Sequence, residues 1–86
     1  MDELKVPEYS NDKTLRECVE AALESYFTQL DGFGASDLYQ LVIQEVEKPL
    51  LETVMREAGG NQSRAATMLG ISRSTLRKKL AQHELN

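Results

Sequence analysis

The sequence has little besides a packed core with which to stabilise a small protein. Its only cysteine is Cys18, so no disulfide can form within the chain, and a lone thiol is typical of a reducing compartment. We expect Cys18 to be a small buried apolar residue. With 86 residues, 41% of them hydrophobic, the chain is one domain at most. It therefore either folds around a small helical core or shares a core with a second chain.

The usual signs of an enzyme are also missing from the sequence. His83 is the single histidine, and we expect it to be solvent-exposed near the end of the chain. The sequence has no cluster of metal ligands, and the Gly-x-Gly of "DGFGAS" follows no strand pattern. Glu45 and Glu47 do not share a helix face and make a poor acid–base pair. We expect no catalysis, no cofactor and no metal.

Long apolar runs are absent as well. None approaches the roughly 18 residues that cross a bilayer, and the stretch "MDELKVPEYSNDK" is acidic, without the apolar segment of a secretory signal. We therefore expect a soluble cytoplasmic protein with no membrane partner.

Basic residues are scarce except near the C-terminus. Residues 1–58 carry thirteen acidic and five basic side chains, whereas residues 59–86 carry one acidic and five basic side chains. The whole chain has a net charge of −4. This asymmetry is typical of a protein that meets a polyanion at one end, although a solvated basic helix face would give the same balance.

The first helical pattern begins after a capping box, in which Thr14 precedes Glu17 by three residues. Apolar residues then recur at alternating steps of three and one, which predicts a helix with one broad apolar face over residues 15–30. The segment before it, residues 1–13, shows no sustained period and is expected to form a flexible N-terminal arm. "DGFGAS" then supplies two glycines, and Ser36 is the expected N-cap of the next helix.

The second helical pattern runs from about residue 37 to residue 58 and is apolar around most of its circumference. A helix of this kind is buried on several sides, and in so short a chain the extra partner is most naturally a second copy. Pro49 lies inside the pattern, and because apolar periodicity resumes after it, we expect a kink and not an end. The expected dimer core consists of Leu38, Leu41, Val42, Val46, Leu50, Leu51 and Val54.

The pattern of the remaining residues predicts a helix, a glycine turn and a second helix. Gly59 and Gly60 end the long helix, Asn61 caps a helix over about residues 62–69, and Ser72 caps another over about residues 73–82. Small alanines at 65 and 66 allow the two helices to cross closely, and Gly70 allows a positive φ at the turn. This is helix-turn-helix geometry, in which the second helix enters the DNA major groove.

The basic face of the last helix suggests how DNA would be contacted. Arg73 lies in the first turn and can read guanine, whereas Arg77, Lys78 and Lys79 can meet phosphates. Backbone N–H groups at the start of the preceding helix can hold a phosphate. The expected DNA-binding residues are Asn61, Ser63, Arg64, Ser72, Arg73, Thr75, Arg77, Lys78 and Lys79.

The stretch "KPLLETVMREAGGNQSRAATMLGISRSTLRKKL" resembles the C-terminal segment of the Fis (factor for inversion stimulation) family. The resemblance continues upstream through "LRECVEAALESYFTQL" and covers about residues 14–86. It implies an all-α fold with four helices per chain, an intertwined homodimer core and a C-terminal helix-turn-helix. It also implies a nucleoid-associated regulator of transcription or recombination that binds and bends DNA, with DNA invertase or RNA polymerase as further partners.

The chain departs from familiar family members at several positions. Ser72 stands where asparagine is common and is shorter, Ala81 and Gln82 replace lysines, and Gly59 replaces a basic residue, so fewer phosphate contacts are expected. Three segments follow from these patterns: an arm over residues 1–13, dimerisation helices over 14–58 and a DNA-binding segment over 59–86. Two alternatives are the detached terminus of an NtrC-type enhancer activator and a helical protein-interaction adaptor.

Overall fold

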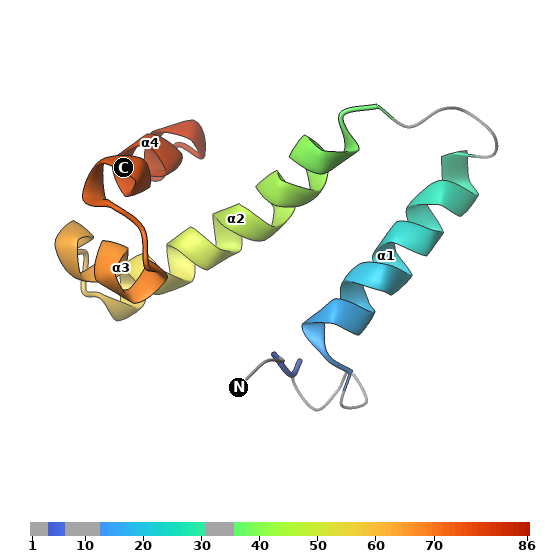
Figure 1. The fold of residues 1–86 in the computed structure, drawn as a ribbon, viewed down its shortest axis with the longest axis horizontal. Coiled ribbons are helices and arrows are strands. Elements are labelled where there is room, and N and C mark those ends of the chain that lie inside the picture. Colours follow the sequence, from blue (N-terminus) through green and yellow to red (C-terminus); the bar gives the residue numbers. More distant parts are fainter. Residues whose placement is uncertain (1–3, 7–12, 31–35) are drawn as a thin grey trace. The chain divides into compact units, whose positions relative to one another are not determined.

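The computed structural model describes residues 4–6, 13–30 and 36–86, and these residues form four α-helices (Figure 1). Their bounds are Leu15–Leu30 for α1, Leu38–Glu57 for α2, Gln62–Leu69 for α3 and Arg73–Gln82 for α4. The all-α class and the four helices are confirmed. The chain divides into two compact units, residues 1–36 and residues 37–86.

In the first unit, α1 begins at the predicted capping box. The Thr14 hydroxyl accepts a hydrogen bond from the Glu17 backbone N–H at 3.1 Å, and the Glu17 carboxylate accepts one from the Thr14 N–H at 2.9 Å. The backbone N–H of Thr14 lowers the pKa of Glu17 most, and the Thr14 hydroxyl and nearby lysines lower it further. Two N–H groups at the start of the helix are thus satisfied reciprocally.

Backbone pairing also joins the start of α1 to the residues before it. The Val6 N–H donates to the Lys13 carbonyl at 2.9 Å, the Leu15 N–H donates to the Leu4 carbonyl at 2.7 Å, and Lys5 forms an isolated antiparallel bridge with Thr14. The expectation of a flexible arm over residues 1–13 did not anticipate this pairing. Residues 1–3 and 7–12 of that arm lie outside the described residues.

The apolar side chains of α1 are more exposed than those of a helix packed in a core. None of its sixteen residues, all of them described, is buried, and the Phe27 side chain is 50% exposed. Cys18 is half-buried, where the sequence predicted a buried residue. Tyr26 and Phe27 form an edge-to-face ring pair with centroids 5.7 Å apart.

The second unit begins at Asp37, one residue after the N-cap that the sequence predicted. Asp37, not Ser36, caps α2: the Asp37 carbonyl accepts from the Leu41 N–H at 3.0 Å. Asp37 has a left-handed backbone with φ of 57°, and its side chain makes no capping hydrogen bond. Aspartate tolerates this conformation better than most residues, but capping side chains normally need an extended backbone to reach the next turn.

The second helix continues through Pro49 without ending. Proline lacks a backbone N–H, so the helix gives up one bond to the carbonyl of Glu45. Beyond that point, Leu51 packs in the core and is only 1% exposed. The continuity agrees with the periodicity of the sequence, and the kink itself stays a prediction.

The core of the second unit joins α2, α3 and α4. Its buried residues are Leu51, Ala58, Ala65, Ala66, Leu76 and Leu80, and the half-buried Val54, Met55, Leu69, Ile71 and Leu85 pack around them. α3 and α4 each contribute two of the six buried residues, and the other two are Leu51 of α2 and Ala58, its C-cap, so the helix-turn-helix is built onto the end of α2. None of the helices in the described parts of the chain is both long and apolar enough to cross a membrane.

Candidate nucleic-acid interface

The turn between α2 and α3 contains two adjacent glycines. Gly59 and Gly60 both have positive φ, 65° and 83°, a combination that favours glycine. The Gly60 N–H donates to the Met55 carbonyl at 2.9 Å and satisfies one of the last carbonyls of α2. The Asn61 side chain then accepts from the Arg64 N–H at 3.0 Å, which confirms Asn61 as the cap of α3.

The turn between α3 and α4 has the features that the sequence predicted. Ala65 and Ala66 are 0% and 4% exposed, so the helices cross where side chains are smallest. Gly70 has φ of 76°, and its N–H donates to the Ala66 carbonyl at 2.9 Å. Ile71 is half-buried against the core, and its N–H donates to the same carbonyl at 3.1 Å.

Hydroxyl groups gather at the start of α4. The Ser72 hydroxyl accepts from the Thr75 N–H at 3.1 Å, which confirms Ser72 as the cap. It also donates to the Thr75 hydroxyl at 2.9 Å and lies 3.2 Å from the Ser74 hydroxyl. Ser74 was not among the predicted site residues, although its position in the first turn of the helix was available as a signal.

Core packing decides which face of α4 is outward. Leu76 and Leu80 are 0% and 1% exposed, so the side of the helix that carries them faces α2 and α3. Arg73, Arg77 and Lys78 are exposed on the remainder. The predicted residues Asn61, Ser63, Arg64 and Ser72 are also exposed, and Thr75 is half-buried.

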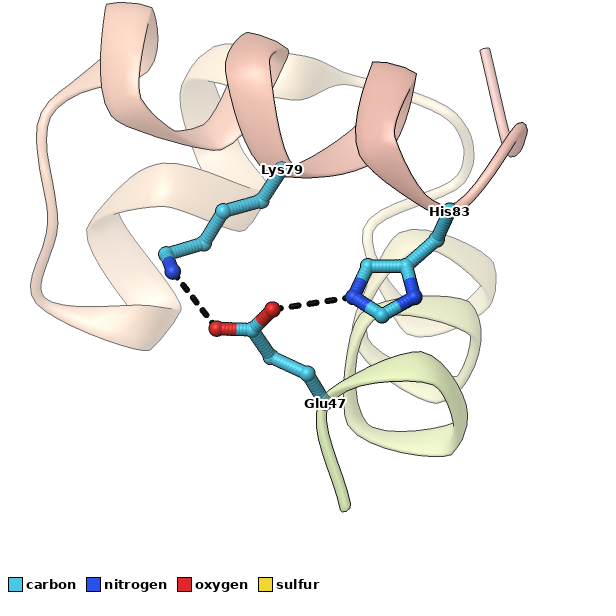
Figure 2. Close-up of polar contacts among 3 residues, drawn as sticks. All are labelled: Glu47, Lys79 and His83. Carbon is cyan, nitrogen blue, oxygen red and sulfur yellow. Dashed lines mark hydrogen bonds and ion pairs between the residues drawn. The ribbon is translucent and has the colours of Figure 1, made fainter. Parts of the chain in front are cut away.

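Lys79 differs from the other predicted DNA-binding residues because its side chain turns toward α2 (Figure 2). Its ammonium lies 2.5 Å from one carboxylate oxygen of Glu47, and His83 Nε2 lies 2.9 Å from the other. The side chains of Lys79, Glu47 and His83 are 33%, 17% and 8% exposed. The expectation that His83 is solvent-exposed was therefore wrong: the ring is covered and bonded to α2.

The surroundings of Glu47 stabilise its charged form. The hydrogen bond from Lys79, followed by that with His83, holds the pKa of the Glu47 carboxyl below its ordinary value of 4.5. The cluster borders an open groove whose walls include Tyr39, Ile43 and Gln82. Within the described residues, no group of acidic, histidine and cysteine side chains could hold a metal ion.

The predicted dimer core divides into two groups. Leu41, Val46 and Leu50 are 43%, 40% and 46% exposed in a single chain, and Leu38 and Val42 are half-buried. Leu51 is 1% exposed and packs, with the half-buried Val54, in the core of its own chain. Tyr39, which the predicted set omitted, is 74% exposed on the same helix.

Known protein families match this chain in both its N-terminal and its C-terminal part. Residues 42–83 match the family described as "Bacterial regulatory protein, Fis family", and residues 2–33 match the "DNA-binding protein Fis N-terminal domain". Relatives named "DNA-binding protein Fis" include those of Actinobacillus succinogenes, 56% identical over 75 residues, and Vibrio atlanticus, 55% identical over 74. The matches cover 87% and 86% of this chain and 76% of each relative. The chain belongs to the Fis family.

Proposed function

We propose that the chain is a dimeric regulator of the bacterial nucleoid that binds and bends double-stranded DNA. The observation that carries the proposal is the outward basic face of α4, which Leu76 and Leu80 orient within a helix-turn-helix. A second helix oriented in this way enters the major groove in proteins of known mechanism. The printed name of the relatives, "DNA-binding protein Fis", supports the same function.

Each part of the interface would contribute a different kind of contact. Arg73 is exposed in the first turn of α4, where a recognition helix reaches base edges, and its guanidinium can bond O6 and N7 of guanine. Arg77 and Lys78 are exposed farther along and would meet phosphates. At the start of α3, the backbone N–H groups beside Ser63 and Arg64 would hold another phosphate.

A homodimer follows from the apolar surface that one chain leaves exposed. Leu41, Val46 and Leu50 of α2 are each at least 40% exposed, and a helix that is apolar on more than one side is normally buried against a partner. Such a dimer would present two recognition helices to one duplex. The spacing that the family resemblance implies is less than one turn of straight DNA, so the duplex would have to bend.

Among the alternatives, the detached terminus of an NtrC-type activator is the less favoured. Residues 2–33 match an N-terminal domain specific to Fis, a segment that such a terminus would not be expected to carry. A protein-interaction adaptor would share the exposed apolar residues of α2, but it would have no need of the outward arginines Arg73 and Arg77.

A gel-shift experiment with circularly permuted DNA fragments tests binding and bending together. We expect a dimer to shift each fragment, with a mobility that depends on where the bound site lies. Log affinity should fall steeply with log salt, by about 0.9 per phosphate neutralised, because counterions are released. Absence of binding at low salt would refute the proposal, and mobility that is independent of site position would refute bending alone.

A further inference from the structure

One carboxylate of α2 is bonded to a side chain of α4 and to the side chain of the residue that caps the C-terminus of α4. Lys79 lies in the last turn of α4, and His83, four residues later, is the C-cap of that helix. Glu47 meets both, with its two oxygens divided between the Lys79 ammonium at 2.5 Å and the His83 ring at 2.9 Å (Figure 2). Both bonds belong to the unit of residues 37–86, which also contains the candidate DNA interface.

These bonds constrain α4 in a way that its apolar contacts do not. Leu76 and Leu80 bury α4 in the core, but apolar burial is not directional. Charge-assisted hydrogen bonds are short and directional. A carboxylate held by two side chains one turn apart therefore resists rotation of α4 about its own axis. Rotation of the helix would redirect Arg73 and Arg77, which project from its exposed face.

We infer that Glu47 and Lys79 are positioning residues for DNA recognition. Glu47, bonded to Lys79 and His83, fixes the orientation of α4 on α2, and Lys79 acts through Glu47 instead of contacting a phosphate. The inference rests on the proposed DNA-binding function and adds to it, because it separates the lysine that orients the recognition helix from the lysine that meets DNA. The latter is Lys78, the exposed neighbour of Lys79.

The electrostatics of the cluster agree with this assignment. The bonds to Lys79 and His83 lower the pKa of Glu47, so its carboxylate is charged at the neutral pH of a binding experiment. The charge of Lys79 is consequently balanced by a neighbour at 2.5 Å before DNA arrives. A phosphate that recruited Lys79 would leave Glu47, only 17% exposed, without its main partner.

Two matched pairs of variants test the inference. Glu47→Gln removes the charge of the cluster, and Glu52→Gln removes the same charge from an exposed position of α2. Lys79→Met and Lys78→Met remove neighbouring ammonium groups from α4. Affinity is measured over a range of salt concentrations for two duplexes, the one that the wild-type protein selects from a random pool and poly(dI–dC).

We expect the ratio of specific to non-specific affinity to fall about fivefold in Glu47→Gln and Lys79→Met. A change of this size corresponds to the interaction free energy of a partly exposed ion pair. Glu52→Gln should keep the wild-type ratio. Lys78→Met should weaken both duplexes alike and reduce the salt slope by about 1. Lys79→Met should leave the slope unchanged because its charge is already balanced. A purely stabilising role would leave the ratio of the folded variants unchanged.

Amide hydrogen exchange reports the orientation step without DNA. We expect faster exchange in α4 for Glu47→Gln and Lys79→Met, and wild-type rates for the two controls. Unchanged exchange in α4, or an unchanged affinity ratio, would overturn the positioning role. If Lys79→Met instead weakened the affinity for both duplexes alike and flattened the salt slope, the positioning role would also be overturned. Lys79 would then be a phosphate contact. A wild-type chain that binds neither duplex would instead refute the proposed function itself.

Discussion

The two units of the chain differ in how far each completes its own core. In residues 37–86, six side chains from α2, α3 and α4 are buried together, and Leu76 and Ala65 have no exposed surface. In residues 1–36, no side chain of α1 is buried, and Phe27 is half exposed. The helix-turn-helix is thus organised by its own chain, whereas the apolar residues of α1 remain without comparable cover.

The same contrast divides α2 along its length. Leu51, toward its C-terminal end, and its C-cap Ala58 are buried against α3 and α4, whereas Leu41, Val46 and Leu50 are at least 40% exposed. One long helix therefore closes the core of the helix-turn-helix at one end and leaves apolar side chains exposed along the rest, where we propose that a second chain associates. Folding of the helix-turn-helix and the proposed dimerisation therefore depend on different residues of α2, so each can be disturbed separately.

The largest expected effect is on the closed core. Leu76→Ala should destabilise the protein by about 3–5 kcal/mol, because it removes a fully buried side chain and leaves a cavity. Thermal and urea unfolding measure the loss. The matched control is Met68→Ala on α3, which truncates a side chain that is 50% exposed and should cost much less. Equal losses in the two variants would contradict the core described here.

The next effect concerns the exposed part of α2. Val46→Glu should dissociate the proposed dimer at a cost of several kcal/mol, because two unpaired charges would be buried in the shared core. Sedimentation equilibrium measures the change. Gln44→Glu adds the same charge to an exposed polar position of α2 and should leave association intact. A wild-type chain that is a stable folded monomer at low micromolar concentration would refute the shared core.

A smaller effect is expected at the recognition helix. Arg73→Ala should weaken specific sites by about 1–3 kcal/mol through loss of a guanine contact, with little change in stability because Arg73 is exposed. Footprinting and competition binding measure it, with Ala81→Ser, at an exposed position late in α4, as a control. Unchanged footprints in Arg73→Ala would remove this arginine from base reading.

The smallest effect depends on pH and on Glu47. The folded-state pKa of Glu47 is lowered, so its contribution is present above the ordinary value of 4.5 and is lost as the pH falls through the lowered pKa. At neutral pH, Glu47→Gln should lower the free energy of unfolding by about 1 kcal/mol. This difference should shrink below pH 4.5. A difference that grows on acidification would contradict the sign of the effect, and Glu52→Gln serves as the reference.

Local signals account for most of what the sequence predicted correctly. Thr14 and Glu17, Asn61, Ser72 and Gly70 each specify a helix end through atoms within a few residues, and the structure places each in the expected role. The error at Ser36 arose because two potential capping residues are adjacent, and the left-handed backbone of Asp37 selected the second. Residues 4–6 and 13–15 pair through their backbones, but their sequence has no alternating pattern that would have predicted this pairing.

Short-range periodicity and backbone preference predicted the four helices and the glycine turns, and the composition showed the concentration of positive charge near the C-terminus. No such signal showed that Leu51 belongs to the core of its own chain or that Glu47 bonds Lys79 and His83. The bonds of Glu47 join residues 32 and 36 positions apart along the chain, a separation over which neither helical period nor capping chemistry carries information. Their geometry exists only once α2, α3 and α4 have packed around a common core.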